Sequence, residues 1–173
     1  GGLAGYNYSG TIYACYATGP VNGSNNFVGG LVGYNNGLTS TSSASSSVVG
    51  KDFIGGLAGH NSETAELSLC YSTGFVSGTG GNIGGLVGQN IGDVSACLWD
   101  METSGRTTSS GGIGKTTDEM MDLSTYASAG WDFQDADSDP IDWWLPSGEY
   151  PLLASNAAPS GTLKFSLRTF TVD

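Results

Sequence analysis

The sequence is poor in positive charge and has no long apolar run. It carries 5 Lys and Arg residues against 16 Asp and Glu residues among 173, so its formal net charge is −11. Because an acidic surface repels phosphate groups, we do not expect a DNA- or RNA-binding module. No stretch approaches the roughly 18 apolar residues of a membrane-spanning helix, so we expect no transmembrane segment.

The acidic residues are unevenly placed along the chain. Only Asp52, Glu63 and Glu66 precede Gly92, and the other thirteen lie from Asp93 onward. Such a shift in charge predicts that the chain changes to a different type of structure near Asp93. The length fits one domain or one domain with a tail. No secretory signal is visible, so the chain is expected to be a mature product or a fragment.

Glycine is abundant, with 29 residues, and it marks an internal repeat. Gly-Gly-Leu begins at Gly1, Gly29, Gly55 and Gly84, and a weaker Gly-Gly-Ile begins at Gly111, with spacings of 28, 26, 29 and 27. An Asn stands six places after the first Gly of each full unit, at Asn7, Asn35, Asn61 and Asn90. Four matches at near-constant spacing indicate a repeat architecture.

Each unit holds short β-type runs between Gly and Asn turns, and no amphipathic helix of useful length. Helix-containing repeats are therefore excluded. A unit of about 27 residues suits one coil of a solenoid, in which parallel coils stack at roughly 4.8 Å and share a core. We predict an all-β fold: a short parallel β-solenoid (β-helix) of about four coils at 1–114, an acidic aromatic cap with a short helix at 115–154, and a linker and terminal strand at 155–173.

Stacking predicts columns of equivalent side chains. The four Asn residues are expected to form an amide ladder, in which each side chain bonds the next. Cys15, Cys70 and Cys97 share a column with Ser42 and are expected to be small buried side chains. They lack the spacing and His partners of a zinc site. One leucine column and one Val/Ile column flank the Gly-Gly pairs, and the sequence leaves open which of them faces inward.

Gly-Gly-Leu-Val-Gly-x-Asn followed by Cys-Tyr-(Ala/Ser)-Thr-Gly-x-Val resembles the GLUG-motif repeat, named for its Gly-Leu-x-Gly core. The segment from Cys97 to Leu152 is similar to the one that commonly closes such arrays. The resemblance implies a large secreted or surface-anchored bacterial or archaeal protein, often adhesin-like, with a β-helix-like fold. It implies no catalytic residues.

His60, the single histidine, occupies a place that other units fill with Tyr or Gln, so we expect an exposed turn residue and no Ser-His-Asp triad. Beyond the repeat, Thr116-x-x-Glu119 predicts a capping box for a short helix that could cover the open end of the core. A phosphate loop at Gly111 is rejected because Ser109 stands where that motif needs glycine.

Two ligand classes are considered for the cap. Asp135, Asp137, Asp139 and Asp142 approach the spacing of a calcium loop, but Pro140 and Pro146 replace its Gly and Glu, so only a looser Ca²⁺ site remains as a hypothesis. Trp143, Trp144 and Tyr150 predict either a small hydrophobic core or a platform that stacks on surface glycans. Asn22 is the better of two N-glycosylation acceptors. No other cofactor is expected.

The tail predicts a strand. Leu163, Phe165 and Leu167 alternate with polar residues, which is typical of a half-buried strand that packs in cis or in trans. The first coil is expected to leave an open edge, covered by upstream repeats or by another copy of the chain. Head-to-tail contact that does not close would give a filament bridged by this strand.

Together these features predict a non-catalytic, extracellular or cell-surface structural protein that is adhesin-like and self-assembling. The alternative is a carbohydrate-binding module of a larger secreted protein.

Overall fold

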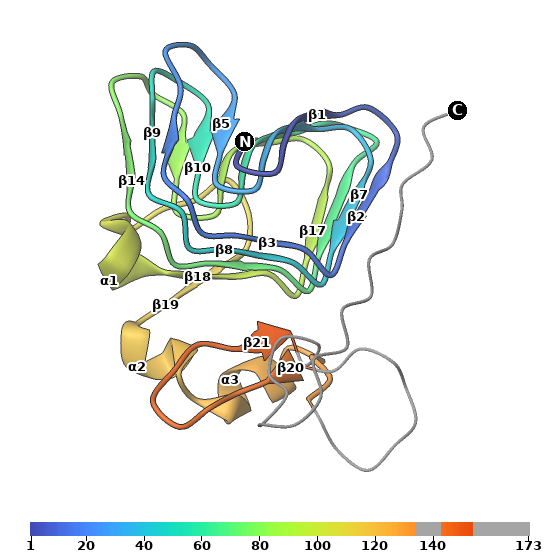
Figure 1. Ribbon diagram of the computed structural model, residues 1–173, viewed down its shortest axis with the longest axis vertical. Helices are drawn as coiled ribbons and strands as arrows, with labels where there is room; N and C mark the ends of the chain where they lie inside the picture. Colours follow the sequence, from blue (N-terminus) through green and yellow to red (C-terminus); the bar gives the residue numbers. More distant parts are fainter. Residues whose placement is uncertain (134–142, 154–173) are drawn as a thin grey trace.

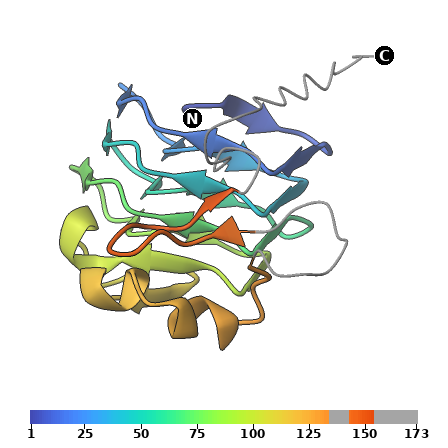
Figure 2. The same cartoon turned by 60° about the horizontal axis from the view of Figure 1, so that its bottom comes forward.

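The computed structural model describes residues 1–133 and 143–153 and confirms a parallel β-solenoid of about four coils (Figure 1). The calcium hypothesis on Asp135, Asp137, Asp139 and Asp142 and the terminal strand with Leu163, Phe165 and Leu167 lie outside the described residues. Figure 1 looks along the stack, so that equivalent strands of successive coils overlap. Figure 2 shows the coils as layers, with the N-terminal coil at one end.

Five parallel sheets run along the stack, one for each position in the coil. Sheet A contains β1 (Ala4–Asn7), β6 (Val32–Asn35), β11 (Ala58–Asn61) and β16 (Val87–Asn90). Sheet B contains β2 (Thr11–Tyr13), β7 (Leu38–Ser40), β12 (Glu66–Ser68) and β17 (Asp93–Ser95). Sheet C contains β3 (Tyr16–Ala17), β8 (Ser43–Ala44), β13 (Tyr71–Ser72), β18 (Leu98–Asp100) and β19 (Ile113–Lys115). Sheet D contains β4 (Val21–Asn22), β9 (Val48–Gly50) and β14 (Val76–Gly78), and sheet E contains β5 (Val28–Gly29), β10 (Ile54–Gly55) and β15 (Ile83–Gly84).

Both apolar columns left open by the sequence face inward, in separate clusters. Leu31, Leu57 and Leu86 are fully buried in the main core. Val28 and Ile54 pack with Val48 and Val76 in a second cluster beside sheets D and E. The bend at Gly-Gly separates the two columns, so one thin coil buries both.

The Gly-Gly pairs are required by close backbone approach. A Cβ at Gly29, Gly55 or Gly84 would lie 2.1, 2.0 or 2.0 Å from the carbonyl oxygen of the residue three places on. In the coils, the residues with a left-handed backbone conformation (positive φ) are not glycines. They occupy two equivalent positions of the coil: Ala14, Thr41, Leu69 and Ala96 in one, and Phe27 and Phe53 in the other. Such residues ordinarily cost about 1–2 kcal/mol each, which the stacking between coils must offset.

The weaker repeat at Gly111 does not begin another equivalent coil. Ile113 pairs with Leu98 in sheet C, and not with a residue of the leucine column. The reason is α1 (Met101–Ser104), which follows β18 directly and shifts the path of the chain by part of a coil.

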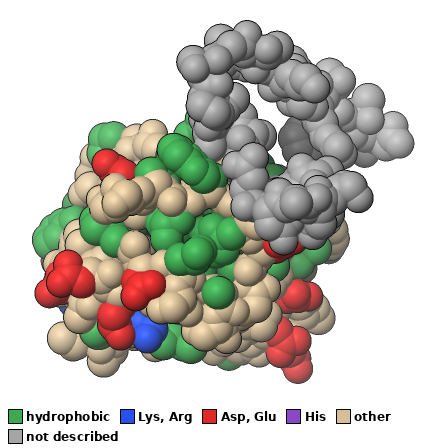
Figure 3. Space-filling model, turned by 90° about the horizontal axis from the view of Figure 1, so that it is seen from below, with side chains coloured by type: hydrophobic (Ala, Val, Ile, Leu, Met, Phe, Trp, Pro, Cys, Tyr) green, Lys and Arg blue, Asp and Glu red, His purple; other side chains and the backbone are tan. Residues whose placement is uncertain are grey.

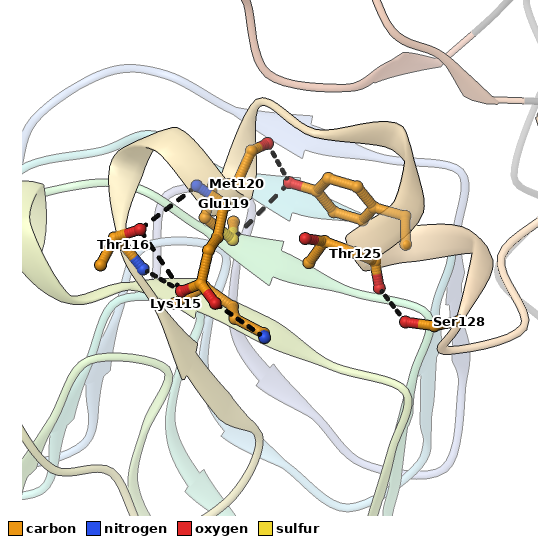
Figure 4. A network of polar contacts seen from close by, with 7 residues as sticks. Lys115, Thr116, Glu119, Met120, Thr125 and Ser128 are labelled. Carbon is orange, nitrogen blue, oxygen red and sulfur yellow. Dashed lines mark hydrogen bonds and ion pairs between the residues drawn. The ribbon is translucent and has the colours of Figure 1, made fainter.

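The cap consists of α2 (Thr117–Met120), α3 (Leu123–Ala127) and the antiparallel pair β20 (Trp143–Trp144) and β21 (Leu152–Leu153). The capping box forms at Thr116 and Glu119 (Figure 4). The expectation that this helix covers the open end of the core is wrong. Met120 packs with Tyr71 and Leu98, on the outer face of sheet C, so the cap lies on the flank of the rod (Figures 1 and 2).

Candidate interaction surface

The N-terminal coil exposes side chains that later coils bury. Leu3 is 50% exposed, whereas its equivalents Leu31, Leu57 and Leu86 are 0% exposed. Tyr6, Tyr8, Tyr13 and Tyr16 of the same coil are also exposed. The apolar end of the rod therefore faces solvent in the described structure. We call this surface the N-terminal face, defined by the exposed Leu3 and Tyr6 and by Asn7, Ile12 and Ala17, which are buried at the ends of their columns.

Backbone hydrogen bonds repeat along the leucine column with one polarity. The Leu31 carbonyl accepts from the Leu3 and Ala4 N–H groups, at 2.9 and 3.1 Å. The Leu57 and Leu86 carbonyls accept an equivalent pair of bonds from the coil before each of them. No described residue makes this pair of bonds to the Leu3 carbonyl. The N-terminal face therefore presents an acceptor at this point.

The four asparagines form a continuous amide ladder with the same polarity. Asn7 Nδ2 donates to Asn35 Oδ1 at 2.8 Å, Asn35 Nδ2 to Asn61 Oδ1 at 2.9 Å, and Asn61 Nδ2 to Asn90 Oδ1 at 2.8 Å. Asn7 Oδ1 accepts the Gly10 N–H at 3.0 Å but receives no side-chain amide among the described residues. A second acceptor of the repeat thus faces the open end.

An aromatic column runs beside the ladder. Tyr6 stacks on Tyr34 with ring centroids 4.7 Å apart, and Tyr34 contacts His60 at 4.5 Å. His60 is buried in β11, so the expectation of an exposed turn residue is wrong: the neighbouring coils and the ring of Phe27 cover it. Burial lowers the pKa of the His60 imidazole, and its buried Nδ1 has no hydrogen-bond partner. At the N-terminal end of the column, the Tyr8 ring stacks on Tyr6 with ring centroids 5.9 Å apart.

At the C-terminal end of the coils the core is covered, while β16 and β17 remain edge strands of sheets A and B within the described residues. Trp99 occupies the inward position that Ala17, Ala44 and Ser72 fill in earlier coils, and it is 3% exposed. The segment after α1 then covers the last coil: Gly85 N–H donates to Thr108 O, and Ser110 N–H donates to Val87 O. Met101 packs beside Trp99 against the core. The two ends of the rod therefore differ in kind.

The cysteines lie along one column and are free thiols. Cys70 and Cys97 are buried, while Cys15 in the first coil is half-buried. Ser42 fills the gap, where its Oγ accepts the Cys15 N–H at 3.1 Å. Burial raises the pKa of the Cys70 thiol, which makes it a poor nucleophile.

One buried carboxylate joins the rod to the cap. Asp100 is fully buried, and its Oδ1 accepts the N–H groups of Glu102 and Thr103 at the start of α1. Its Oδ2 accepts the hydroxyls of Thr117 and Tyr150, each at 2.7 Å. These bonds tie α2 and the β20–β21 hairpin to the last coil.

The structure separates the three predicted glycan-stacking residues. Trp143 is 2% exposed in the cap core, and Tyr150 is half-buried with its hydroxyl on Asp100. Trp144 alone is exposed, because neighbours in a strand point to opposite faces. Asn22 is exposed at the end of β4. Figure 3 shows the cap side, with apolar side chains near its centre and several acidic ones toward its edges.

A hollow of about 400 Å³ lies between sheet C and the cap hairpin. The small Ser43 forms its floor between Tyr16 and Tyr71 of the flanking coils, and Pro151–Leu153 form one wall. Thr18 and Ser45 add hydroxyls, and none of the lining side chains is charged. Sequence reasoning missed this hollow, because it depends on where the cap packs.

Within 1–133 and 143–153, no group of three or more His, Cys, Asp or Glu side chains is arranged to hold a metal ion. In the same ranges, no helix has the length and apolar character needed to cross a membrane.

Comparisons with known proteins agree with the repeat. The GLUG motif matches residues 1–22. Over 94 residues, 51% of the chain, the sequence is 34% identical to a protein of Evansella cellulosilytica whose name describes it as a Gly-rich membrane protein. Over 109 residues, 58% of the chain, it is 31% identical to halomucin of Haloquadratum walsbyi. No solved structure matches the chain.

The matched segments are small parts of these relatives, 10% of the first and 1% of the second. The likeness therefore concerns a short part of each relative and not the whole proteins. Residues 1–22 carry a GLUG motif, and the chain is similar to short segments of two much longer proteins whose names place them at a membrane or describe a mucin.

Proposed function

We propose that this chain is a structural, non-catalytic segment of a surface-associated repeat protein, located outside the cell or on its surface. The carrying observation is the continuous stacked core of coils whose first part is uncharged: no Lys, Arg, Asp or Glu occurs before Lys51. A rod of this kind gains length by adding coils, since each coil contacts only its neighbours. The names of the relatives support the surface location.

We also propose that this chain has no catalytic activity. His60, the single imidazole, is enclosed in the aromatic column, and the thiols of Cys70 and Cys97 are buried in the core. General acid–base catalysis needs titratable groups within reach of a substrate, and the coils offer few.

Surface labelling tests the proposal. Intact source cells are treated with a protease or an impermeant biotin reagent, and the segment is followed with an antibody raised against residues 1–133. Labelling equal to that of a known surface protein is expected. Protection in intact cells, with labelling only after lysis, would contradict the surface location.

We further propose that the protein is adhesin-like and that its copies assemble into filaments. Copies that stack head to tail need two open coil ends, and the C-terminal end is closed by Trp99 and residues 108–110. A filament would therefore depend on the segment with Leu163, Phe165 and Leu167. Electron microscopy of the full chain, compared with a chain ending at Leu153, would reveal filaments that require this segment. Monodisperse monomers of both at all concentrations would argue against them.

The second candidate function is glycan binding. The hollow at Ser43 favours it, because an aromatic ring, apolar walls and uncharged hydroxyls suit a neutral sugar. A glycan array would test it with Tyr16→Ala, which removes the exposed ring at the hollow, and Tyr13→Ala, which removes an exposed ring elsewhere in the same coil. Saturable binding lost only in Tyr16→Ala is expected, and equal binding by both variants would exclude this site.

A further inference from the structure

We propose that the hollow at Ser43 takes the terminal ring of a neutral glycan, in the place where the neighbouring coils carry tyrosine rings. The inference rests on the second candidate function, glycan binding, and specifies which part of a glycan the hollow takes. It also assigns a role to the irregular segment of the second coil, residues 42–47, which departs from the sequence of the other units.

The hollow lies where one tyrosine of a column is missing. In sheet C, Tyr16 pairs with Ser43 and Ser43 pairs with Tyr71, so the two tyrosines flank a serine at equivalent positions. Two strand spacings separate their backbones, which is roughly 9.6 Å along the stack. Tyr6 and Tyr34, in adjacent coils of sheet A, stack with ring centroids 4.7 Å apart. The gap at Ser43 therefore has the length that one further six-membered ring needs.

The hollow has a firmly packed side and an accessible side. Tyr71 is 5% exposed, and its hydroxyl donates to the Pro151 carbonyl, which fastens the cap hairpin beside the gap. Leu153 of the same hairpin is buried. Tyr16 is 56% exposed and contributes the accessible ring of the lining. The hollow is thus bounded by the first coil, the third coil and the hairpin, and an entering ring can pack its apolar C–H face on Tyr16.

The floor of the hollow selects the end of a glycan chain. A tyrosine ring at position 43 would point away from sheet C, with its inner end at the backbone. A sugar ring in the same place has its inner end against Ser43, so this end cannot carry a further sugar unit. Only its outer end is free to join the rest of the glycan. The volume of about 400 Å³ lies near the lower limit for ligand pockets, which also fits a short terminal portion.

The polar groups of the lining favour a neutral sugar over an aromatic side chain. Thr18 and Ser45 line the hollow and are exposed, and neither hydroxyl has a hydrogen-bond partner in the part of the chain that the structure describes. Hydroxyls both donate and accept, as the hydroxyl groups of a sugar do. None of the lining side chains is charged and the net charge of the chain is −11, so uronic and sialic acids are disfavoured.

The first test fills the hollow from within. Ser43→Tyr restores the missing ring and removes none of the other lining side chains. We expect this variant to keep or raise the Tm, because Tyr16 and Tyr71 occupy the same position in their own coils. Its affinity for a glycan selected on the array should fall by on the order of tenfold or more, because the added ring clashes with the ligand. Ser95→Tyr, at an exposed serine of β17, is the matched control and should bind as the unmodified chain does.

A second measurement locates the bound ring by nuclear magnetic resonance. Methyl glycosides of glucose, galactose, mannose and N-acetylglucosamine are added one at a time to the full chain. At least one should shift the backbone amides of residues 16–18 and 43–45. Its uronic acid form should bind more weakly by on the order of tenfold, because a carboxylate loses water in an uncharged hollow. No shift with any of the four would overturn the proposal, and shifts with tyrosine amide alone would replace the sugar by an aromatic side chain of a partner.

A third measurement separates a terminal ring from an interior unit. The sugar selected by these shifts is offered at the end of one oligosaccharide and only within the chain of another. Binding to the first alone is expected, and equal binding to both would overturn the assignment to a chain end.

The double variant Thr18→Ala/Ser45→Ala guards against misfolding of Ser43→Tyr, since both side chains are exposed. It should lose affinity by on the order of tenfold, because two hydrogen-bonding hydroxyls are removed. A glycan that binds the unmodified chain and both of these variants equally would overturn the site and leave glycan binding in place. Absence of binding to every glycan on the array would instead overturn glycan binding itself. The surface-labelling test is independent of all these outcomes.

Discussion

The two ends of the solenoid differ in how far the core is covered. At the C-terminal end, Trp99 replaces a small inward residue, and the chain folds across the last coil. At the N-terminal end, Leu3 and Tyr6 remain exposed, and two acceptor columns stop at Leu3 and Asn7. At the C-terminal end, one large side chain and a change of chain direction are therefore enough to cover the core of the repeat.

The largest expected effect is at the closed end. Trp99→Ala should destabilise the fold by about 3–5 kcal/mol, because it removes a buried indole and leaves a cavity against Gly85 and Gly114. Leu3→Ala at the open end should cost less than about 1 kcal/mol, since the side chain is 50% exposed. Urea unfolding of the two variants provides the measurement. Equal losses would remove the distinction between the ends.

The next effect concerns the joint between rod and cap. Asp100→Ala leaves two N–H groups of α1 and the hydroxyls of Thr117 and Tyr150 without their acceptor. We expect a loss of about 2–3 kcal/mol, because these groups are partly or fully buried. Near-ultraviolet circular dichroism should show looser packing of the cap aromatics. Glu63→Ala, which removes an exposed carboxylate of the coils away from this joint, is the control. An unchanged spectrum for Asp100→Ala would show that the cap does not need the carboxylate.

The Asn ladder allows the ends to be compared with the middle. Asn35→Ala leaves a buried amide on each side without its partner, so a loss of roughly 2 kcal/mol is expected. Asn7→Ala breaks one ladder bond at the open end and should cost roughly half as much. Thermal unfolding of both variants checks the order. A larger loss for Asn7→Ala would contradict the expectation that the middle of the ladder contributes more than its end.

The repeat made the coils predictable and left the cap unpredictable. A constant spacing fixes which residues share a column, so the Asn ladder and the parallel sheets follow from the sequence. The burial of His60 does not, because it depends on the rings of Phe27 and Tyr34 in another coil. The position of the cap depends on Tyr71 and Leu98, which point outward from sheet C. Their outward direction could not be predicted from alternation of apolar and polar residues, because the strands are short and are interrupted by bends.

The register of Ile113 shows the same limit. Gly-Gly-Ile at Gly111 resembles the start of a unit, yet Ile113 pairs with Leu98, because α1 and the closing segment take up part of a coil. A local motif predicts a backbone shape, whereas its column depends on every residue placed before it. The hollow at Ser43 is hidden from the sequence for this reason too, since one of its walls belongs to the cap.

The smallest expected effect is the pH response of the aromatic column. Burial lowers the pKa of His60 below its ordinary value of 6.5, so the folded state binds fewer protons than the unfolded state below that pH. Stability from the neutral imidazole is therefore present above pH 6.5 and is lost as the pH falls below it. His60→Gln, which copies Gln89 at the same place in the next coil, should flatten the dependence of Tm on pH between 6.5 and 5. Tyr13→Phe, an exposed ring away from this column, is the control. If His60→Gln keeps the slope of the unmodified chain, the acid response arises in the carboxylates of the cap and not in the column that ends at the open face.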